Sequence, residues 1–244
     1  MSIVCKNCGA PVGSHFCPEC GQKATTGRLT VGHVLEETWH SVTHTDRSFL
    51  HLLGLMIKRP GKVITDFIGG QRKRYFNPYM FYVVVTGLLI FVREKVFARE
   101  DSLYHYHDEF GQIINKEYEL LVLFSIPVMA LFFWLIFQRR KYNYAEWVTV
   151  LIFAYGLINF GEILIQLLYL PLIRYHIHGQ SYTDLIDYLI LAYILTGVTR
   201  PAKWWHWVQI ALGVSILYAF IYYIASPIAL LLHGESWDGV RYSF

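Results

Sequence analysis

The sequence predicts an all-α polytopic membrane protein with about five transmembrane helices, a small amino-terminal four-cysteine zinc ribbon and interfacial amphipathic helices between them. All four cysteines lie within the first twenty residues. The 244 residues are 55% hydrophobic and 16% charged, whereas soluble domains have about 25% charged residues. Aromatic residues make up 17%, as expected of a protein that meets two lipid–water interfaces. We divide the chain into residues 1–24, the zinc ribbon, 25–76, the interfacial helices, and 77–244, the transmembrane domain.

The cysteines form two Cys-x2-Cys pairs, each followed by a glycine, Gly9 or Gly21. The four ligands are Cys5, Cys8, Cys17 and Cys20. Two intervening residues let both thiolates face one ion, and glycine can take the left-handed conformation that such a turn needs. Four thiolates make a closed, structural Zn²⁺ site, whose metal affinity supplies the folding free energy of so short a segment. Two disulfides in a secreted module are the alternative, but no signal peptide precedes the motif. We therefore expect reduced thiolates on the cytosolic side.

Five apolar stretches approach the roughly 20 residues that a membrane-spanning helix needs. They are Pro78–Phe97, Leu120–Phe137, Trp147–Pro171, Tyr182–Thr199 and Trp205–Leu232. The first and the fourth are the weakest, because the uncharged run Tyr79–Val92 is short and because Asp184 and Asp187 stand near the start of the fourth. The alternative for each stretch is a re-entrant or interfacial helix.

The distribution of basic residues predicts the orientation. With the zinc ribbon in the cytosol and five crossings, eleven basic residues from residue 58 onward lie inside. These are Lys58, Arg59, Lys62, Arg72, Lys73, Arg74, Arg139, Arg140, Lys141, Arg200 and Lys203. Four lie outside, namely Arg99, Lys116, Arg174 and Arg241, and Arg93 and Lys95 stand at the edge of the first span. This asymmetry follows the positive-inside rule. We expect a multi-pass inner-membrane protein with a cytosolic amino terminus and an outer carboxyl terminus.

The segment before the first span is neither linker-like nor membrane-spanning. An apolar helix over Phe49–Ile57 should end at Arg59-Pro60-Gly61, because proline does not continue a helix. A short helix over Val63–Ile68 should follow, and then a basic, aromatic-bearing turn. Helices broken by basic turns just before a span are typical of the cytosolic interface, where lysine and arginine attract anionic lipid headgroups. The candidate headgroup contacts are Lys58, Arg59, Lys62, Arg72, Lys73 and Arg74. Alternatively, these charges only fix the topology.

This segment also carries a resemblance. The zinc knuckles are followed by Lys58-Arg59-Pro60-Gly61-Lys62-Val63-Ile64, Phe67-Ile68, Gly70, Arg72, Tyr75 and Pro78. Over about residues 1–95 this pattern resembles a bacterial family of unknown function, whose members are small integral membrane proteins with an amino-terminal zinc ribbon. Beyond these residues the likeness is one of hydropathy. The resemblance implies a bacterial inner-membrane protein, and it implies no activity and no catalytic residues.

Histidines suggest two further metal sites. If Thr30–Ile57 were one helix, a stripe of four histidines would share one face with Glu37; they are His33, His40, His44 and His51. A polar face packed on the ribbon or on water is the alternative. In the predicted outer loops, the pairs His105 and His107, and His176 and His178, have the i, i+2 spacing that suits capture of Zn or Cu from an extended chain. Surface histidines on aromatic-rich loops need no metal.

The third predicted span carries polar residues on one face, Asn159, Glu162 and Gln166. An ionisable residue within a membrane is a candidate functional group. An unpaired Glu162 would carry a proton at neutral pH. The alternative is that these residues hydrogen-bond between helices and hold the bundle together.

Three functions remain open, and the sequence favours a non-enzymatic role. The first is a membrane adaptor or scaffold whose zinc ribbon recruits a cytosolic protein partner. The second is a small transporter or channel that uses Glu162 and the outer histidines, and the third is an enzyme that acts on lipid headgroups. The chain lacks a phosphate-binding glycine loop, a Gly-x-Ser-x-Gly elbow and a His-Glu-x-x-His motif. The net charge of +3 does not indicate a nucleic-acid partner, and a homo-oligomer is compatible with the sequence.

Overall fold

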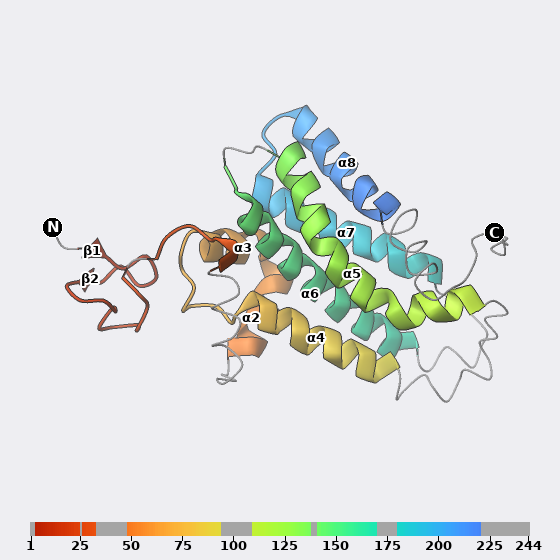
Figure 1. The fold of residues 1–244 in the computed structure, drawn as a ribbon, viewed down its shortest axis with the longest axis horizontal. Coiled ribbons are helices and arrows are strands. Elements are labelled where there is room, and N and C mark those ends of the chain that lie inside the picture. Colours follow the sequence, from red (N-terminus) through yellow and green to blue (C-terminus); the bar gives the residue numbers. More distant parts are fainter. Residues whose placement is uncertain are drawn as a thin grey trace.

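The computed structural model describes residues 3–24, 26–32, 48–93, 109–137, 141–169 and 180–220. These residues contain two short strands and seven helices. The elements are β1 (Ile3–Val4), β2 (Pro11–Val12), α2 (Ser48–Lys58), α3 (Pro60–Ile68), α4 (Pro78–Val92), α5 (Glu109–Ile136), α6 (Tyr144–Tyr169), α7 (Gln180–Thr199) and α8 (Trp204–Phe220). The helices form one bundle, and the antiparallel β1–β2 hairpin projects from one end of it (Figure 1). The predicted all-α architecture with an amino-terminal cysteine segment is therefore confirmed.

The helix break predicted at Arg59-Pro60-Gly61 is confirmed. The helix α2 ends at Lys58, and Pro60 occupies the first turn of α3, where its missing N–H is not needed. The apolar side of α3 is buried against the bundle, where Phe67 meets Phe153 edge to face at 5.6 Å between ring centroids. At Gly61 the backbone of α3 touches that of Gly197 in α7, and a Cβ added there would lie 2.4 Å from the Gly197 backbone. The helix α3 is thus packed into the bundle along its apolar side.

Each of the five predicted spans overlaps a described helix, and residues 94–97 of the first span and 170–171 of the third lie outside the described residues. By length and composition, two of the described helices can cross a membrane, over Glu119–Ile136 in α5 and Tyr144–Leu168 in α6. The other described helices among the five have shorter apolar stretches: α4 has 15 residues, the apolar part of α7 is Leu185–Thr199, and α8 has 17 residues. The last part of the predicted fifth span lies outside the described residues.

Contacts between the helices show their relative directions. The helices α4 and α6 run parallel, because Tyr79 contacts Thr149 near their starts and Arg93 contacts Glu162 near their ends. The neighbouring α7 runs the opposite way, since Lys141 and Tyr142, just before α6, contact Val198 near the end of α7. One end of the bundle, here called the ribbon end, therefore carries the hairpin and the starts of α4 and α6. The opposite end is called the far end (Figure 1).

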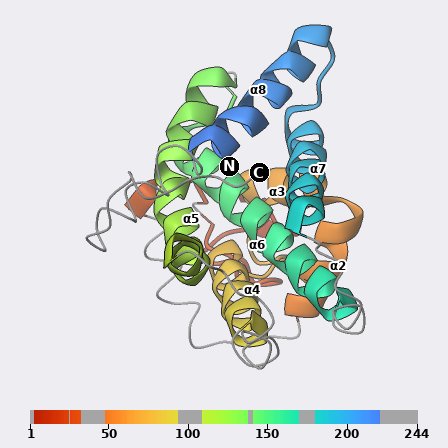
Figure 2. The ribbon, with the colours of Figure 1, turned by 90° about the vertical axis from the view of Figure 1, so that its right-hand side faces the viewer.

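The helix α6 forms the centre of the bundle, and Figure 2 shows it between α4 and α5 on one side and α7 on the other. Within the two membrane-length stretches, 72% of the α6 residues are buried, against 39% in α5. Trp147 of α6 is fully buried, and its ring lies 5.7 Å from that of Phe133 and 5.2 Å from that of Phe137, between ring centroids. The core of the protein is therefore built around α6.

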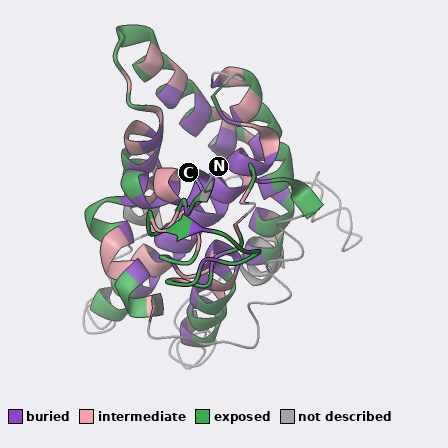
Figure 3. Cartoon of the chain, turned by 90° about the vertical axis from the view of Figure 1, so that its left-hand side faces the viewer, coloured by how far each residue is buried: buried purple, intermediate pink, exposed green. Residues whose placement is uncertain are grey.

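Large apolar side chains also cover the outside of the bundle. Figure 3 shows exposed residues on the outer faces of the helices and buried ones toward the interior. Phe91 of α4, Phe124 of α5, Leu189 of α7 and Trp204 of α8 are all more than half exposed. Transfer of each of these side chains from water to an apolar surrounding would be favourable. The outer faces of α4, α5, α7 and α8 are consequently suited to an apolar environment.

Candidate functional site

Two matching turns present the four cysteines. In the first turn, the N–H of Cys5 donates to the carbonyl of Ala10 and the N–H of Gly9 donates to that of Cys5, each at 2.9 Å. The second turn repeats the pattern, with Cys17 bonded to Gln22 and Gly21 bonded to Cys17. Gly9 and Gly21 have φ angles of +80° and +68°, which confirms the predicted left-handed conformation. Both turns therefore aim their sulfurs at a common point.

The sulfur atoms fit a tetrahedral zinc ion. All four lie within 4.8 Å of one another, and the Cys5–Cys20 and Cys8–Cys17 pairs are 3.6 and 3.5 Å apart. Zn–S bonds of about 2.3 Å in a tetrahedron place the sulfurs about 3.8 Å apart. None of the four is in a disulfide. In the described part of the chain, this is the one group of three or more His, Cys, Asp or Glu residues placed to hold a metal ion.

The two cysteine turns are fastened to the basic turn that precedes α4. The buried side chain of Gln22 donates to the carbonyl of Gly70 at 2.8 Å and accepts from the N–H groups of Arg72 and Lys73 at 3.2 and 3.3 Å. The side chain of Asn7 accepts from the N–H of Arg74 at 3.1 Å. Gly70 has a φ of +109°, and a Cβ there would meet the side chain of Lys6 at 2.9 Å, so the turn requires glycine at this point.

A second contact fastens the segment after the ribbon to the start of α6. Arg28 donates to both carboxylate oxygens of Glu146, at 3.0 and 2.6 Å, and its guanidinium also bonds the carbonyl of Lys141. Glu146 and Asn143 bond each other's backbone N–H groups, which is the reciprocal arrangement of a capping box. The hydrogen bonds with Glu146 raise the pKa of Arg28 above its ordinary value. The ribbon is therefore held to the bundle at two separate places.

The predicted headgroup contacts lie along this ribbon end. Lys58, Arg59, Lys62, Lys73 and Arg74 are exposed. Arg72 is half-buried and donates to the carbonyl of Gly27 at 2.9 Å, so part of its hydrogen-bonding capacity is used within the protein. The backbone of residues 70–74 is fixed by the ribbon, while the side chains of Lys73 and Arg74 remain exposed. The ribbon thus holds a cationic surface in one conformation.

A buried ionic cluster lies toward the far end of the bundle. Arg93, just after α4, donates to Glu119 of α5 at 3.0 Å and pairs with Glu162 of α6. Asn159 donates to the other oxygen of Glu119 at 3.2 Å and to the hydroxyl of Thr86 at 2.9 Å. Glu119, Glu162 and Asn159 are buried. The cluster therefore combines one half-buried cation, Arg93, with two buried carboxylates in a largely apolar bundle.

Two of the three intramembrane residues predicted from the sequence meet in this cluster. Asn159 and Glu162 take part in the contacts above, whereas Gln166 is half-buried and its Oε1 has no hydrogen-bond partner among the described residues. The prediction that Glu162 carries a proton at neutral pH assumed an unpaired carboxyl group, but Glu162 pairs with Arg93. Arg93 and Glu119 were not predicted from the sequence as site residues. The signal in the sequence was that each residue borders an apolar run: Arg93 follows the first run, and Glu119 precedes the second.

The predicted histidine sites lie largely outside the described residues. This applies to His105, His107, His176 and His178, and also to His33, His40 and His44 of the histidine stripe. His51 is exposed on α2. These two metal hypotheses stay predictions.

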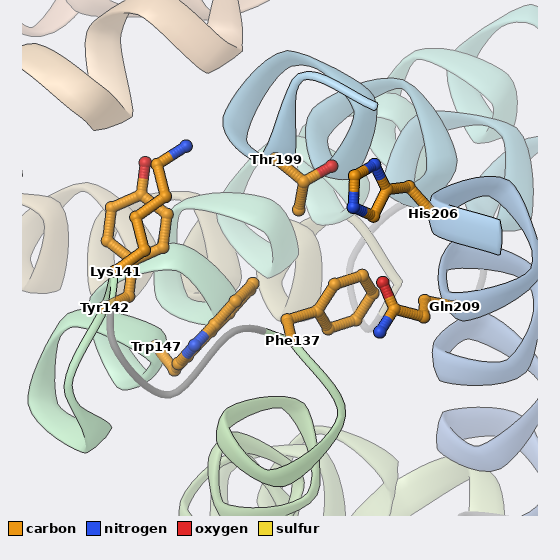
Figure 4. A pocket seen from close by; sticks show the side chains of 7 residues that line it. All are labelled: Phe137, Lys141, Tyr142, Trp147, Thr199, His206 and Gln209. Carbon is orange, nitrogen blue, oxygen red and sulfur yellow. The ribbon is translucent and has the colours of Figure 1, made fainter. Parts of the chain in front are cut away.

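A small pocket lies at the ribbon end between the starts of α6 and α8 and the end of α7 (Figure 4). Phe137 and Trp147 lie between Lys141 and Tyr142 on one side and Thr199, His206 and Gln209 on the other (Figure 4). Its cavity volume is about 10 Å³, which is roughly the room of one water molecule. The pocket suits one water near the buried ring of Trp147 and is too small for an organic ligand.

The family match with known proteins covers the first helices of the bundle, which follow the ribbon in the chain. No curated protein and no solved structure matches the chain. Residues 46–90 match the model of a family described as "Protein of unknown function (DUF3667)". This stretch includes α2, α3, the basic turn fixed by Gln22 and most of α4. The chain thus shares residues 46–90 with a family of unknown function and carries a four-cysteine cluster ahead of them.

Proposed function

We propose that this protein is a multi-pass adaptor of the bacterial inner membrane, in which a structural zinc ribbon on the cytosolic side recruits a soluble protein partner. The five helices α4 to α8 cross the bilayer with the ribbon end inside and the far end outside. Two membrane-length helices, exposed apolar outer faces and the exposed cations at the ribbon end support this placement.

One observation carries the proposal: the ribbon is fixed to the membrane bundle by its own side chains, while its outer surface is left open. Gln22, Asn7 and Arg28 make the fixing contacts. Val4 and Phe16 of the ribbon are 61% and 58% exposed. A closed four-cysteine site has no open coordination position for chemistry. Its role is therefore to organise the surface around it, and a rigid apolar surface near the bilayer is suited to a protein partner.

The exposed cations beside the ribbon have a supporting role in this proposal. Lys58, Arg59, Lys62, Lys73 and Arg74 attract anionic headgroups at about 1 kcal/mol each near the membrane surface. Such attraction keeps the ribbon end against the inner leaflet, so that the partner is recruited to the membrane surface. We place Arg72 among these groups only in part, because its guanidinium also bonds the carbonyl of Gly27.

Photo-crosslinking in living cells tests the adaptor function. A photoreactive residue replaces Phe16 on the ribbon, and a matched variant carries it at Phe124, which is 74% exposed on α5 and faces lipid in our placement. The expected result is a discrete protein adduct from position 16 that disappears when Cys8→Ser removes the metal site. The same adduct pattern from positions 16 and 124, or an adduct that survives Cys8→Ser, would contradict the adaptor function.

A second candidate function is a small transporter or channel with Glu162 in its path. It is favoured by the buried ionic cluster, because Arg93, Glu119 and Glu162 place a charge imbalance inside the bundle. The outer histidines of this candidate lie outside the described residues. Purified protein in liposomes, assayed for movement of Na⁺, K⁺ and H⁺, tests it directly. The third candidate, an enzyme acting on lipid headgroups, has no comparable observation in its favour.

A further inference from the structure

The interface between α4 and α6 carries a line of buried and half-buried polar side chains, here called the polar track. On α4 the track comprises Tyr79, Tyr82, Thr86 and, just beyond its end, Arg93. On α6 it comprises Thr149, Tyr155, Asn159 and Glu162. The residues on each helix are separated by three or four positions or by simple sums of these, which places them on one face. Because the two helices run parallel, the two faces meet along their length.

Contacts between the helices join the track at three levels. At the ribbon end, Thr149 donates to the carbonyl of Ala145, so Tyr79 donates its hydroxyl proton to Thr149 across 2.9 Å. In the second half, Asn159 bonds Thr86 at 2.9 Å. At the far end, Glu162 pairs with Arg93. Thirteen residues of helix separate Thr149 from Glu162, a rise of about 20 Å, or about two thirds of the hydrocarbon thickness of a bilayer.

Two tyrosines occupy the middle of the track, and each has another hydroxyl group beside its own. Tyr82 and Tyr155 are each 5% exposed. The hydroxyl of Tyr82 lies beside that of Thr86, and the hydroxyl of Tyr155 lies beside that of Ser125. Tyr155 lies within electrostatic range of Tyr82 and of Glu119. Because a hydroxyl group both donates and accepts a hydrogen bond, buried hydroxyls beside one another can pass a proton along.

The charges of the track point to the same use. The far end holds two carboxylates, Glu119 and Glu162, and one guanidinium, Arg93. Asp187 of α7 also lies within electrostatic range of Tyr155 and is a further acidic group near the track. An excess negative charge in an apolar interior is unfavourable unless a cation compensates it. The proton is the one cation that needs no coordination shell and can be passed along hydroxyl groups.

We propose that the polar track carries protons between the far end and the ribbon end of the bundle. This deepens the transporter candidate and rests on it, and it names the proton as the transported species. A proton arriving from the far side binds a carboxylate oxygen of Glu119 or Glu162. Each tyrosine hydroxyl then accepts a proton on its oxygen and releases its own to the next acceptor, so that no net charge stays on it. The proton leaves past Tyr79 and Thr149, one helical turn from Glu146.

Proton flux into liposomes tests the proposal. The zinc-loaded full-length protein is reconstituted with an internal pH dye, and a K⁺ gradient with valinomycin sets the membrane potential. We expect wild-type protein to acidify or alkalinise the lumen according to the sign of the potential. Tyr155→Phe should lower the flux to that of protein-free liposomes, and Glu162→Gln should do the same. The matched control is Tyr144→Phe, whose hydroxyl bonds the carbonyl of Pro127 away from the track and whose flux should equal the wild-type flux.

The outcomes distinguish a failure of the transporter function from a failure of proton conduction along the track. Tyr155→Phe removes a single hydroxyl and leaves the Arg93–Glu162 ion pair intact, so the variant is expected to fold even if Glu162→Gln does not, and size-exclusion elution checks this. Flux of Na⁺ or K⁺ without protons overturns the proton assignment and leaves a transporter. Absence of all three fluxes from folded wild-type protein overturns both. Proton flux that Tyr155→Phe lowers no more than Tyr144→Phe does overturns the role of the track.

Discussion

The contact between Gln22 and the basic turn allows a quantitative prediction. Gln22→Ala removes one hydrogen bond to the Gly70 carbonyl and two from the N–H groups of Arg72 and Lys73. The Gly70 carbonyl belongs to a buried residue, and loss of its partner costs about 1–3 kcal/mol. Arg72 is half-buried and Lys73 is exposed, so water replaces most of what their N–H groups lose. We therefore expect docking of the ribbon on this turn to weaken by about 2 kcal/mol.

Hydrogen exchange of the turn measures this effect. A loss of about 2 kcal/mol corresponds to about a 30-fold larger open population, because 1.4 kcal/mol is a factor of ten. Peptides that contain residues 70–74 should exchange about 30-fold faster in Gln22→Ala than in the wild type, in detergent or nanodiscs. Lys23→Ala, which removes an exposed neighbouring side chain, is the matched control and should exchange as the wild type does.

The metal content decides how the result is interpreted. Gln22 supplies no sulfur ligand, so Gln22→Ala should retain zinc at the wild-type level, as measured by elemental mass spectrometry. Unchanged exchange at residues 70–74 with zinc retained would refute the idea that the ribbon holds the basic turn in place. Loss of zinc together with faster exchange would show instead that Gln22 acts through the metal site.

Three further predictions concern the metal, the packing of α3 and the response to alkali. Cys17 is a buried residue, 2% exposed. Cys17→Ser should abolish zinc binding and the hydrogen-exchange protection of the ribbon, while α6 stays protected. Gly61→Ala places a Cβ against the Gly197 backbone and should lower the free energy of unfolding by about 1–3 kcal/mol, whereas Gly54→Ala, with nothing within 4 Å, should not lower the melting temperature. Burial raises the pKa of Tyr75 from 10.0 to about 12; because the folded pKa is the higher one, this contribution to stability is complete below pH 10 and is lost as the pH rises toward 12. Tyr75→Phe should remove that part of the alkaline destabilisation in pH-dependent unfolding, and an unchanged pH profile would contradict it.

Short-range sequence patterns predicted much of the fold. The spacing of the four cysteines predicts their convergence, because two residues between thiolates allow only a tight turn, and the left-handed glycines Gly9 and Gly21 follow from that turn. The restriction that proline places on its own position predicts the break between α2 and α3. Apolar runs predict the helices from α4 to α8, since any such run needs its backbone groups bonded internally.

The candidate site was only partly predictable. Glu162 and Asn159 were recognisable because they interrupt an apolar run. Their partners Arg93 and Glu119 were not, because a charge at the end of such a run is also what an ordinary membrane boundary shows. The tyrosines of the track were hidden for a related reason, as tyrosine is common at interfaces and inside helix bundles alike.

The sequence by itself predicted the clustering of the four cysteines, the order of the helices and the break between α2 and α3, since these depend on neighbours within a few residues. Only the tertiary structure decided that Gln22 reaches residues 70–73, that Arg28 reaches Glu146, and that Arg93 meets Glu119 and Glu162. Such partners are separated by 26 to 118 positions along the chain. Hydropathy and spacing report which face of an element is polar, but the packing angle and register of two helices decide which polar groups come within hydrogen-bonding distance.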